Sequence, residues 1–261
     1  MTEIHSTAVV HPGAHLAEGV TVGPYSIIGE NVKIGRGTRV ASHAVIEGWT
    51  EIGEGCRIFQ FASIGADPQD LKFRGEKSAL IIGRNNTIRE FVTIHRGTGP
   101  GGGVTRIGDD NLLMAYVHVA HDCGVGNHVV LANAATLAGH ITVQDHAIVG
   151  GLSGLHQFVR IGRHAIIGGC SAVPQDIPPF VSAVGNRAKL YGLNTVGLKR
   201  GGFGEERIAA IKSAYKIIFR SKLPMKEAIE KVRGELAASP DALEMAAFIE
   251  VSMESDRGIC R

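Results

Sequence analysis

Aromatic residues, charge imbalance and long apolar runs are all scarce in this sequence of 261 residues. Phe, Trp and Tyr make up 5% of the chain, the formal net charge is +2, and no stripe of Lys and Arg is present. These features argue against a nucleic-acid partner. No apolar run is long enough to span a bilayer, and no signal peptide pattern opens the chain. We therefore expect a cytoplasmic protein with no integral membrane segment.

Cysteines with a metal-binding or redox spacing are also missing. None of the four cysteines forms a CxxC pair with another. Cys56 and Cys123 occupy the small, inward position of the repeat described next, so we expect buried structural thiols there.

The most informative feature is an aliphatic residue at every sixth position. Ile, Leu or Val recurs at this spacing in three runs, which are Ile4–Ile64, Ile82–Ile94 and Ile107–Val173. The following residue is often Gly, which suits a corner with close backbone approach or a positive φ. The fourth residue after the aliphatic one is small or β-branched, as at Ser26 and Ala44. A hexapeptide period is typical of a parallel β-helix.

Six residues suit one side of a three-sided coil, so residues 18 apart should stack about 4.8 Å from one another. Hexapeptide solenoids of this type resemble the left-handed parallel β-helix, an exception to the right-handed crossover preference. The fold class is therefore mainly β, with residues 1–186 as the β-helix. Segments 66–80 and 97–106 lack the pattern and should project from the coil as loops that serve a binding surface.

The remaining residues, 187–261, should form a connecting segment (187–202) and a C-terminal α-helical domain. Residues 204–221 have apolar side chains at helical spacing. Pro224 suits the first turn of a second helix, and Ser239-Pro240-Asp241 suits the start of a third. These helices would cover the open end of the stacked sheets.

Stacking in eighteens gathers titratable side chains on one edge of three successive coils. His121 should lie beneath Gly139 and Asp122 beneath His140, with His118, His156 and Gln157 nearby. An imidazole can serve as general base toward a hydroxyl, and an adjacent carboxylate can hold its tautomer. The N–H of Gly139 can stabilise an oxyanion. Because the face of a β-solenoid is too flat to enclose a ligand, a neighbouring subunit should supply the other wall.

Eight short motifs along the whole chain resemble one family. They are QFASIG (60–65), QDLKF (69–73), TIHRGT (93–98), DNLLM (110–114), HVAHDC (118–123), LAGH (137–140), HQF (156–158) and GLKRGGF (197–203). Together they are similar to the UDP-N-acetylglucosamine 3-O-acyltransferase family of lipid A biosynthesis. The resemblance implies a homotrimer with active sites between adjacent β-helices. It also implies transfer of a 3-hydroxyacyl chain from the phosphopantetheine thioester of acyl carrier protein to the 3-hydroxyl of UDP-N-acetylglucosamine, without a metal or other cofactor.

The resemblance also assigns roles to residues of this chain. His121 would be the general base, Asp122 its orienting partner and Gly139 the oxyanion donor. Contacts to the sugar nucleotide or the acyl donor would come from Gln69, Asp70, Lys72, His118, His140, His156, Gln157, Asn194 and Arg200.

Three positions concern specificity. Gly169 is stacked over Gly151 and matches the position that sets the length of the acyl chain in the family. Because neither glycine has a side chain, the space there stays open and favours a long chain of about 12 to 14 carbons, each buried methylene adding about 0.8 kcal/mol. Val196 stands where the family pattern has a carboxylate, and Gly201 stands where it has a second Arg. Contacts to the ribose and diphosphate from these two positions are therefore missing or come from Lys199 or a loop.

Three other functions fit the residues less well. A zinc site built from His118, His121 and His140, as in γ-class carbonic anhydrases, leaves Asp122, Gln157 and the QDLKF loop without a role. The N-acyltransferase of the same pathway carries an extra domain before its repeats, whereas the repeat here begins at Ile4. A non-catalytic scaffold would not gather titratable groups on one edge. The residues leave open whether the acceptor is a 3-hydroxyl or a 3-amino group.

Overall fold

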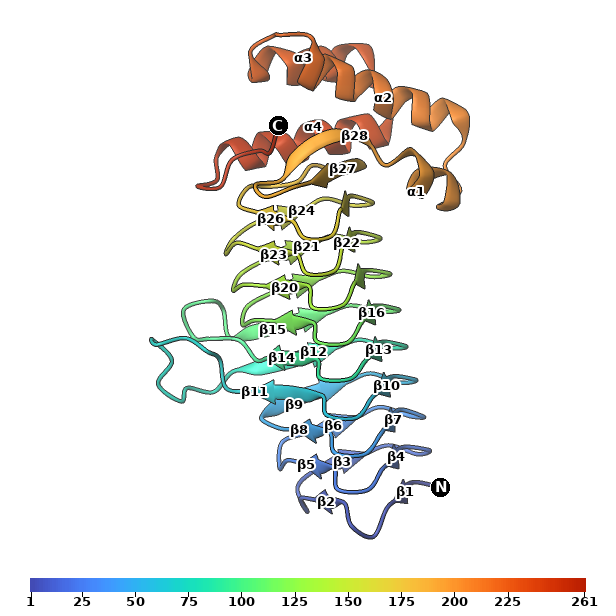
Figure 1. The fold of residues 1–261 in the computed structure, drawn as a ribbon, viewed down its shortest axis with the longest axis vertical. Coiled ribbons are helices and arrows are strands. Elements are labelled where there is room, and N and C mark those ends of the chain that lie inside the picture. Colours follow the sequence, from blue (N-terminus) through green and yellow to red (C-terminus); the bar gives the residue numbers. More distant parts are fainter.

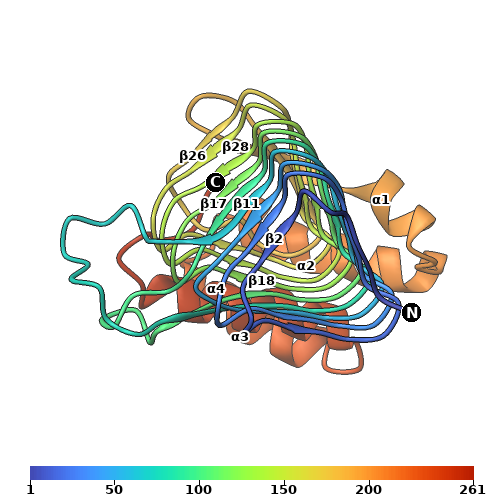
Figure 2. The same cartoon turned by 90° about the horizontal axis from the view of Figure 1, so that it is seen from below.

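The computed structural model describes all residues from 1 to 261, which form a left-handed parallel β-helix crowned by α-helices (Figure 1). The coils have a triangular cross-section with three parallel sheets as walls (Figure 2). The predicted fold class is confirmed. No helix combines the length and the apolar character needed to cross a bilayer.

The strands are short and alternate between the three sheets. The first sheet contains β1 (Glu3–Ile4), β4 (Thr21–Val22), β7 (Arg39–Val40), β10 (Arg57–Ile58), β13 (Thr87–Ile88), β16 (Leu112–Leu113), β19 (Val130–Leu131), β22 (Ile148–Val149), β25 (Ile166–Ile167), β27 (Val181–Val184) and β28 (Lys189–Leu193). The second contains β2 (Val9–Val10), β5 (Ile27–Ile28), β8 (Val45–Ile46), β11 (Ser63–Ala66), β14 (Thr93–His95), β17 (His118–Val119), β20 (Thr136–Leu137), β23 (Gly154–Leu155) and β26 (Ala172–Val173). The third contains β3 (His15–Leu16), β6 (Lys33–Ile34), β9 (Trp49–Ile52), β12 (Ala79–Ile82), β15 (Val104–Ile107), β18 (Gly124–Val125), β21 (Thr142–Val143) and β24 (Arg160–Ile161).

The register of the sheets confirms the predicted stacking of one coil on the next. Glu3 pairs with Thr21, and His118 pairs with Thr136, both at the spacing that three hexapeptides give. Two coils are longer than this spacing. One separates Arg57 from its partner Thr87, and the other separates Thr87 from its partner Leu112. The extra residues of these two coils are the two predicted loops.

Both loops are shorter than predicted. Irregular backbone spans only 67–78 and 96–103, because the flanking residues join strands of the neighbouring coils. Ala79 and Leu80 pair with Val104 and Thr105, so these residues belong to the third sheet instead of to the loops.

The interior is built from the two inward positions of the repeat. The periodic aliphatic side chains from Val22 to Val173 are buried, and the small residues such as Ser26, Ala44 and Cys56 are fully buried between them. Gly at the following position serves close approach: a Cβ on Gly53 would lie 2.5 Å from the carbonyl carbon of Gly83. Positive φ mostly falls two positions after these glycines and on non-Gly residues, although Gly65 itself has a φ of 86°.

The C-terminal helices begin and end close to the predicted positions. They are α1 (Thr195–Arg200), α2 (Glu205–Arg220), α3 (Met225–Glu235) and α4 (Pro240–Met253). Ser239 caps α4, accepting a hydrogen bond from the N–H of Ala242 at 3.3 Å. The predicted connecting segment 187–202 instead forms β28, antiparallel to β27, and α1, because its backbone continues the first sheet beyond the last coil.

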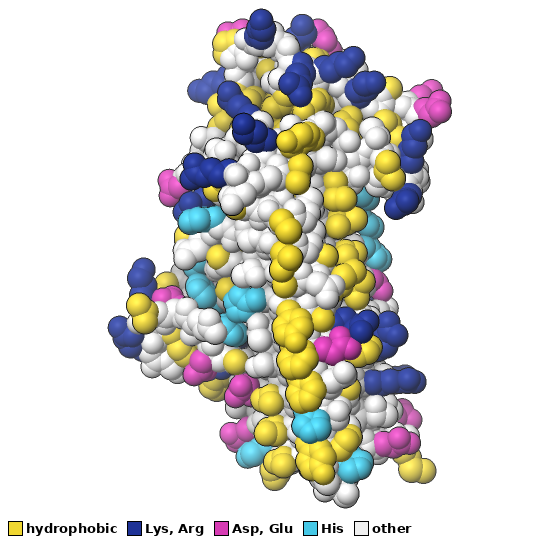
Figure 3. Space-filling model, in the orientation of Figure 1, with side chains coloured by type: hydrophobic (Ala, Val, Ile, Leu, Met, Phe, Trp, Pro, Cys, Tyr) yellow, Lys and Arg dark blue, Asp and Glu magenta, His cyan; other side chains and the backbone are white.

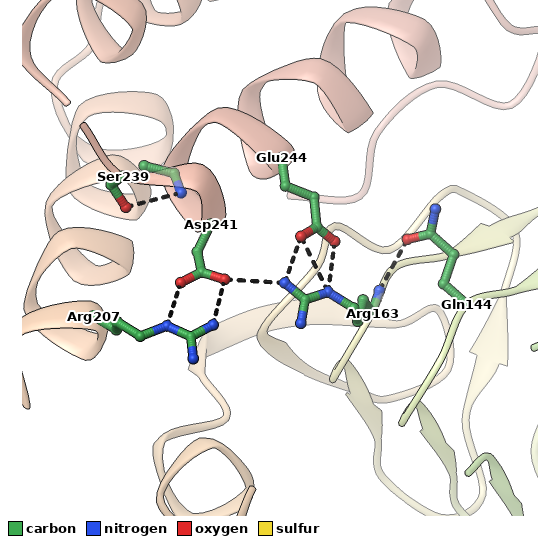
Figure 4. A network of polar contacts seen from close by, with 7 residues as sticks. Gln144, Arg163, Arg207, Ser239, Asp241 and Glu244 are labelled. Atoms are coloured by element: carbon green, nitrogen blue, oxygen red, sulfur yellow. Dashed lines mark hydrogen bonds and ion pairs between the residues drawn. The ribbon is translucent and has the colours of Figure 1, made fainter. Parts of the chain in front are cut away.

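An ion-pair network fixes these helices to the last coils (Figure 4). Arg163, at a corner of the β-helix, donates hydrogen bonds to Glu244 and Asp241 of α4 at 2.6 and 3.0 Å. Arg207 of α2 donates to Asp241 at 2.8 Å. Hydrogen bonds from Arg207 hold the pKa of Asp241 below its usual range. The network joins α2 and α4 to a single corner of the coil.

Candidate functional site

Each corner of the triangular coil carries a distinct column of side chains. The corner between the second and third sheets, formed by residues 120–123, 138–141 and 156–159, is called here the histidine edge. The corner between the third and first sheets bears α1 and is called the α1 corner. The corner between the first and second sheets is called the aromatic corner. Both loops project beside the histidine edge, on the opposite side of the molecule from α1 (Figure 2).

His121 and Asp122 form a close pair at the turn that follows β17. Nδ1 of His121 lies 2.7 Å from Oδ2 of Asp122. An ionised carboxylate accepts this bond from Nδ1–H, which leaves Nε2 of the neutral ring as a proton acceptor. The Asp122 side chain is only 1% exposed and that of His121 is 11% exposed. Asp122 lies at the turn between the second and third sheets, and Thr98 of the loop at 96–103 covers its carboxylate.

Gly139 lies directly above the His121 ring, as predicted. A Cβ at residue 139 would lie 2.6 Å from Cε1 and 2.8 Å from Nε2 of His121, so only Gly fits here. Its N–H donates to no group of the chain. At the α1 corner three equivalent N–H groups are satisfied by side chains of the next coil: Arg84 N–H by Asp109, Asp109 N–H by Asn127 and Asn127 N–H by Asp145. The N–H of Gly139 is therefore a free donor beside the imidazole.

His140 and His118 flank this pair. His140 stacks on Phe158 with ring centroids 4.5 Å apart, and its Nε2 lies 3.8 Å from Asp122 Oδ2. Burial lowers the pKa of His140, opposed by the carboxylates of Asp122 and Asp70. Burial, aided by His121, also lowers the pKa of His118. Both rings are therefore favoured in the neutral state.

The predicted site residues of the first loop are accessible. Gln69 and Lys72 are exposed, and Asp70 is half-buried. Oδ1 of Asp70 accepts a hydrogen bond from the N–H of Lys72 at 2.9 Å, which forms a local turn. Lys72 has no ion-pair partner in the chain, so its ammonium group is free to meet an anionic ligand.

His156 and Gln157 share the edge but do not touch the His121–Asp122 pair. The only polar contact of the His156 ring is 3.4 Å, to the carbonyl of Gln157. Both residues line a hollow on the second sheet together with Asn186 and Arg187.

The remaining predicted residues lie on other corners of the same chain. Asn194 caps α1 and donates to the carbonyl of His164 at 3.0 Å, which holds it at the α1 corner. Arg200 is exposed in the last turn of α1. Gly169 is at the aromatic corner, where its Cβ would lie 3.2 Å from the carbonyl oxygen of Gly151. One chain therefore does not bring Asn194 or Arg200 to His121.

Only two of the three residues of the alternative zinc site, His121 and His140, converge. Ligand atoms that could share a cation belong to His121, Asp122 and His140, within 4.8 Å of one another, and His118 is not among them. His118 Nδ1 instead lies 2.7 Å from the hydroxyl of Thr93. Asp122 already accepts three hydrogen bonds, which a cation would have to displace.

Four residues that the structure brings to the site are not predicted from the sequence. His95 packs edge-on against His118, with ring centroids 4.9 Å apart, and Thr93 contacts His118. Thr98 contacts Asp122, and Arg187 lines the hollow beside His156. The first three lie within the TIHRGT motif, which was the available signal. Arg187 follows the repeats and has no comparable pattern.

Comparisons with known proteins identify the relatives of this chain. Residues 176–260 match the family described as UDP N-acetylglucosamine O-acyltransferase, domain 2, and residues 1–36 match the bacterial transferase hexapeptide repeats. The acyl-[acyl-carrier-protein]–UDP-N-acetylglucosamine O-acyltransferase of Thermodesulfovibrio yellowstonii is 58% identical, with 100% of both chains covered. The structure of LpxA from Acinetobacter baumannii is 46% identical, with a TM-score of 0.94 over 99% of both chains. UDP-N-acetylglucosamine acyltransferase from Francisella novicida is 42% identical, with a TM-score of 0.95 over 99% of this chain and 94% of that one.

The buried His95 should make stability depend on pH. Burial lowers its pKa from 6.5 to about 4, so between these values the unfolded chain binds a proton that the folded chain does not. Stability is then complete above pH 6.5 and falls as the pH drops toward 4, by about 2 kcal/mol between pH 6.5 and 5 from this group. His95→Gln should lose less stability over that interval, measured by thermal melting at each pH.

The exposed His15 supplies the control. His15→Gln should follow the wild-type pH dependence. Equal losses for wild type and His95→Gln would contradict a buried neutral imidazole at position 95.

Proposed function

This chain belongs to the UDP-N-acetylglucosamine O-acyltransferase family, and we propose that its histidine edge is the catalytic centre. There a 3-hydroxyacyl chain passes from acyl carrier protein to the 3-hydroxyl of UDP-N-acetylglucosamine, the first step of lipid A biosynthesis. The observation that carries the proposal is the His121–Asp122 pair beneath the free N–H of Gly139. The relatives are O-acyltransferases by name, which favours the hydroxyl acceptor over an amine.

The chemistry follows from these three groups. Nε2 of His121 removes the proton from the sugar hydroxyl as its oxygen attacks the thioester carbonyl. The N–H of Gly139 donates to the resulting oxyanion. When the tetrahedral intermediate collapses, the C–S bond breaks and the thiol of the carrier leaves with the proton held by His121. Asp122 stabilises the imidazolium throughout. No step needs a metal or an additional cofactor, because base and oxyanion donor are both present.

The surrounding residues suit binding of the sugar nucleotide and the donor. Neutral His118 and His140 offer hydrogen bonds without placing a second positive charge beside the base. Gln69, Asp70 and Lys72 line the accessible loop, and His156 and Gln157 line the hollow further along the edge. A free cation such as Lys72 or Arg200 suits a diphosphate. Val196 is 61% exposed and apolar, so no carboxylate at that position meets the ribose.

We further propose that the protein is a homotrimer whose threefold axis runs along the aromatic corner. Side chains from Tyr25 to Tyr116 stack there, with Phe61, Phe91 and Tyr116 ring centroids 5.0 and 4.8 Å apart. They form an exposed apolar column along the molecule (Figure 3). Monomers rarely expose so long a patch. With this corner inward, the second sheet of one subunit faces the first sheet of the next.

This arrangement completes the site. The outer end of the second sheet is the histidine edge, and the outer end of the first sheet is the α1 corner. The His121 of one subunit then lies opposite the Asn194 and Arg200 of its neighbour.

Lys199, Arg200 and Arg220 supply positive charge at the helical end of the molecule for an acidic carrier protein. A cytoplasmic location is part of the proposal, supported by four cysteines that form no disulfide.

Replacing the base should abolish turnover. His121→Ala should lower kcat about 10²- to 10⁴-fold, because no other group takes the proton of the hydroxyl. The readout is the mass of the acylated nucleotide sugar formed from UDP-N-acetylglucosamine and 3-hydroxymyristoyl-acyl carrier protein. His15→Ala, on an exposed strand remote from the edge, is the control and should retain full activity. Equal product from His121→Ala and wild type would overturn the assignment of the base.

A charge at the aromatic corner should break the trimer. In sedimentation, wild type should have three times the subunit mass of 27.6 kDa, and Phe91→Glu should have mainly the mass of one subunit. Val251→Glu on α4 should remain trimeric.

Mixed trimers of His121→Ala and Arg200→Ala subunits should recover part of the activity that each variant lacks. No recovery from trimers shown to be mixed would contradict a site shared between subunits.

The length of the acyl chain should depend on Gly169. In competition between donors, wild type should prefer chains of about 12 to 14 carbons, each buried methylene contributing about 0.8 kcal/mol. Gly169→Met should shift the preference to shorter donors, because the side chain fills the column above Gly151. Gly234→Met on α3, at a position where a Cβ meets no atom within 4 Å, is the control. A wild-type preference for ten carbons or fewer would contradict the open column.

A further inference from the structure

The buried carboxylate of Asp122 is held by one residue of the second loop. Thr98 is 1% exposed and donates two hydrogen bonds to it: its N–H to Oδ1 at 2.8 Å and its hydroxyl to Oδ2 at 2.6 Å. The same Oδ2 lies 2.7 Å from Nδ1 of His121. Both oxygens are thus engaged, and Thr98 supplies two of the three close donors.

The hydroxyl of Thr98 has a defined direction. Its oxygen accepts a hydrogen bond from the N–H of Gly101 at 3.3 Å, so its own proton is left for Asp122. The carbonyl of Thr98 accepts from Gly101 and Gly103 at 3.1 and 2.7 Å, which closes the loop on itself. The side chain therefore acts as a fixed donor.

Hydrogen bonds connect the first loop (67–78) to the second loop (96–103). Oε1 of Glu76 accepts from the N–H of Gly99 at 3.0 Å, and its Oε2 accepts from the N–H of Arg74 at 2.8 Å. Hydrogen bonds from Arg74 and Gly99 hold the pKa of Glu76 below its usual range. Glu76 therefore ties the loop that bears Asp70 and Lys72 to the residue next to Thr98.

We propose that Thr98 is a positioning residue for the transfer reaction, acting through Asp122 on the orientation and basicity of His121. The inference rests on the proposed function. The terminal torsion of an Asp side chain is soft, so the carboxylate would otherwise rotate. Two donors fixed on one loop set its plane and direct Oδ2 at Nδ1 of His121. They also offset the cost of burying a charge, which is high for an ionised carboxylate without partners.

The first test compares Thr98→Val with Thr98→Ser. Val keeps the shape and the backbone N–H but removes the hydroxyl donor, whereas Ser keeps the donor. Loss of a hydrogen bond to a charged group predicts a decrease in kcat of about 10- to 100-fold for Thr98→Val, with KM for the sugar nucleotide nearly unchanged. Thr98→Ser should recover most of the activity. Thr142→Val, on an exposed strand where the hydroxyl forms no hydrogen bond within the chain, is the matched control.

The pH profile separates positioning from a structural role. Without the hydroxyl of Thr98, the carboxylate of Asp122 has one hydrogen-bond donor fewer and attracts a protonated His121 ring more strongly. His121 therefore stays protonated, and inactive as a base, up to a higher pH. The acidic limb of kcat should therefore move to higher pH in Thr98→Val and stay in place in Thr98→Ser. In an Asp122→Asn background, Thr98→Val should cause little further loss, because the effect passes through the carboxylate.

Several outcomes would overturn the inference. These are a Thr98→Val variant with wild-type kcat and pH profile, a Thr98→Ser variant as impaired as Thr98→Val, or full additivity with Asp122→Asn. His121→Ala in the same assay separates this failure from failure of the proposed function. If His121→Ala is inactive while Thr98→Val is normal, only the role of Thr98 is wrong. If His121→Ala is fully active, the base assignment is wrong as well.

Discussion

The stacking register of one coil on the next is the constraint on which the rest of this structure depends. Parallel pairing at a constant spacing aligns equivalent positions of successive coils, as for His118 and Thr136. The two insertions leave the coil without disturbing the register above or below them. A shift of one residue would turn the buried aliphatic columns outward. The same register that fills the core therefore fixes the geometry of the histidine edge.

The candidate functional residues lie at the corners, because the corners are where the sequence of a solenoid can vary. The sheets need aliphatic side chains inside, whereas each turn carries outward residues that are free of that requirement. One corner collects histidines and loops, another collects exposed aromatic rings, and the third carries α1. A triangular section separates these features within one chain. The proposed trimer would bring unlike corners of neighbouring subunits together.

The electrostatics of the edge depend on burial. Several imidazoles lie close together, and burial lowers the pKa of His95, His118 and His140 so that they are favoured as neutral rings. Asp122 is the one carboxylate in contact with His121, and the loops shield it from water. A base that must gain and release a proton in each turnover benefits from a single fixed counter-charge.

The sequence by itself determined the repeat, the coil length, the helices after residue 204 and the pairing of His121 with Gly139 and of Asp122 with His140. These features follow from local periodicity, because residues 18 apart must meet in a regular coil. Only the tertiary structure decided that Thr98 and His95 join the site, that residues 189–193 form a strand, and that Asn194 lies at a different corner from His121. Loops have no period, so their contacts depend on how the chain folds back. The path after the last coil depends on the exposed edge of the first sheet, which no repeat position encodes.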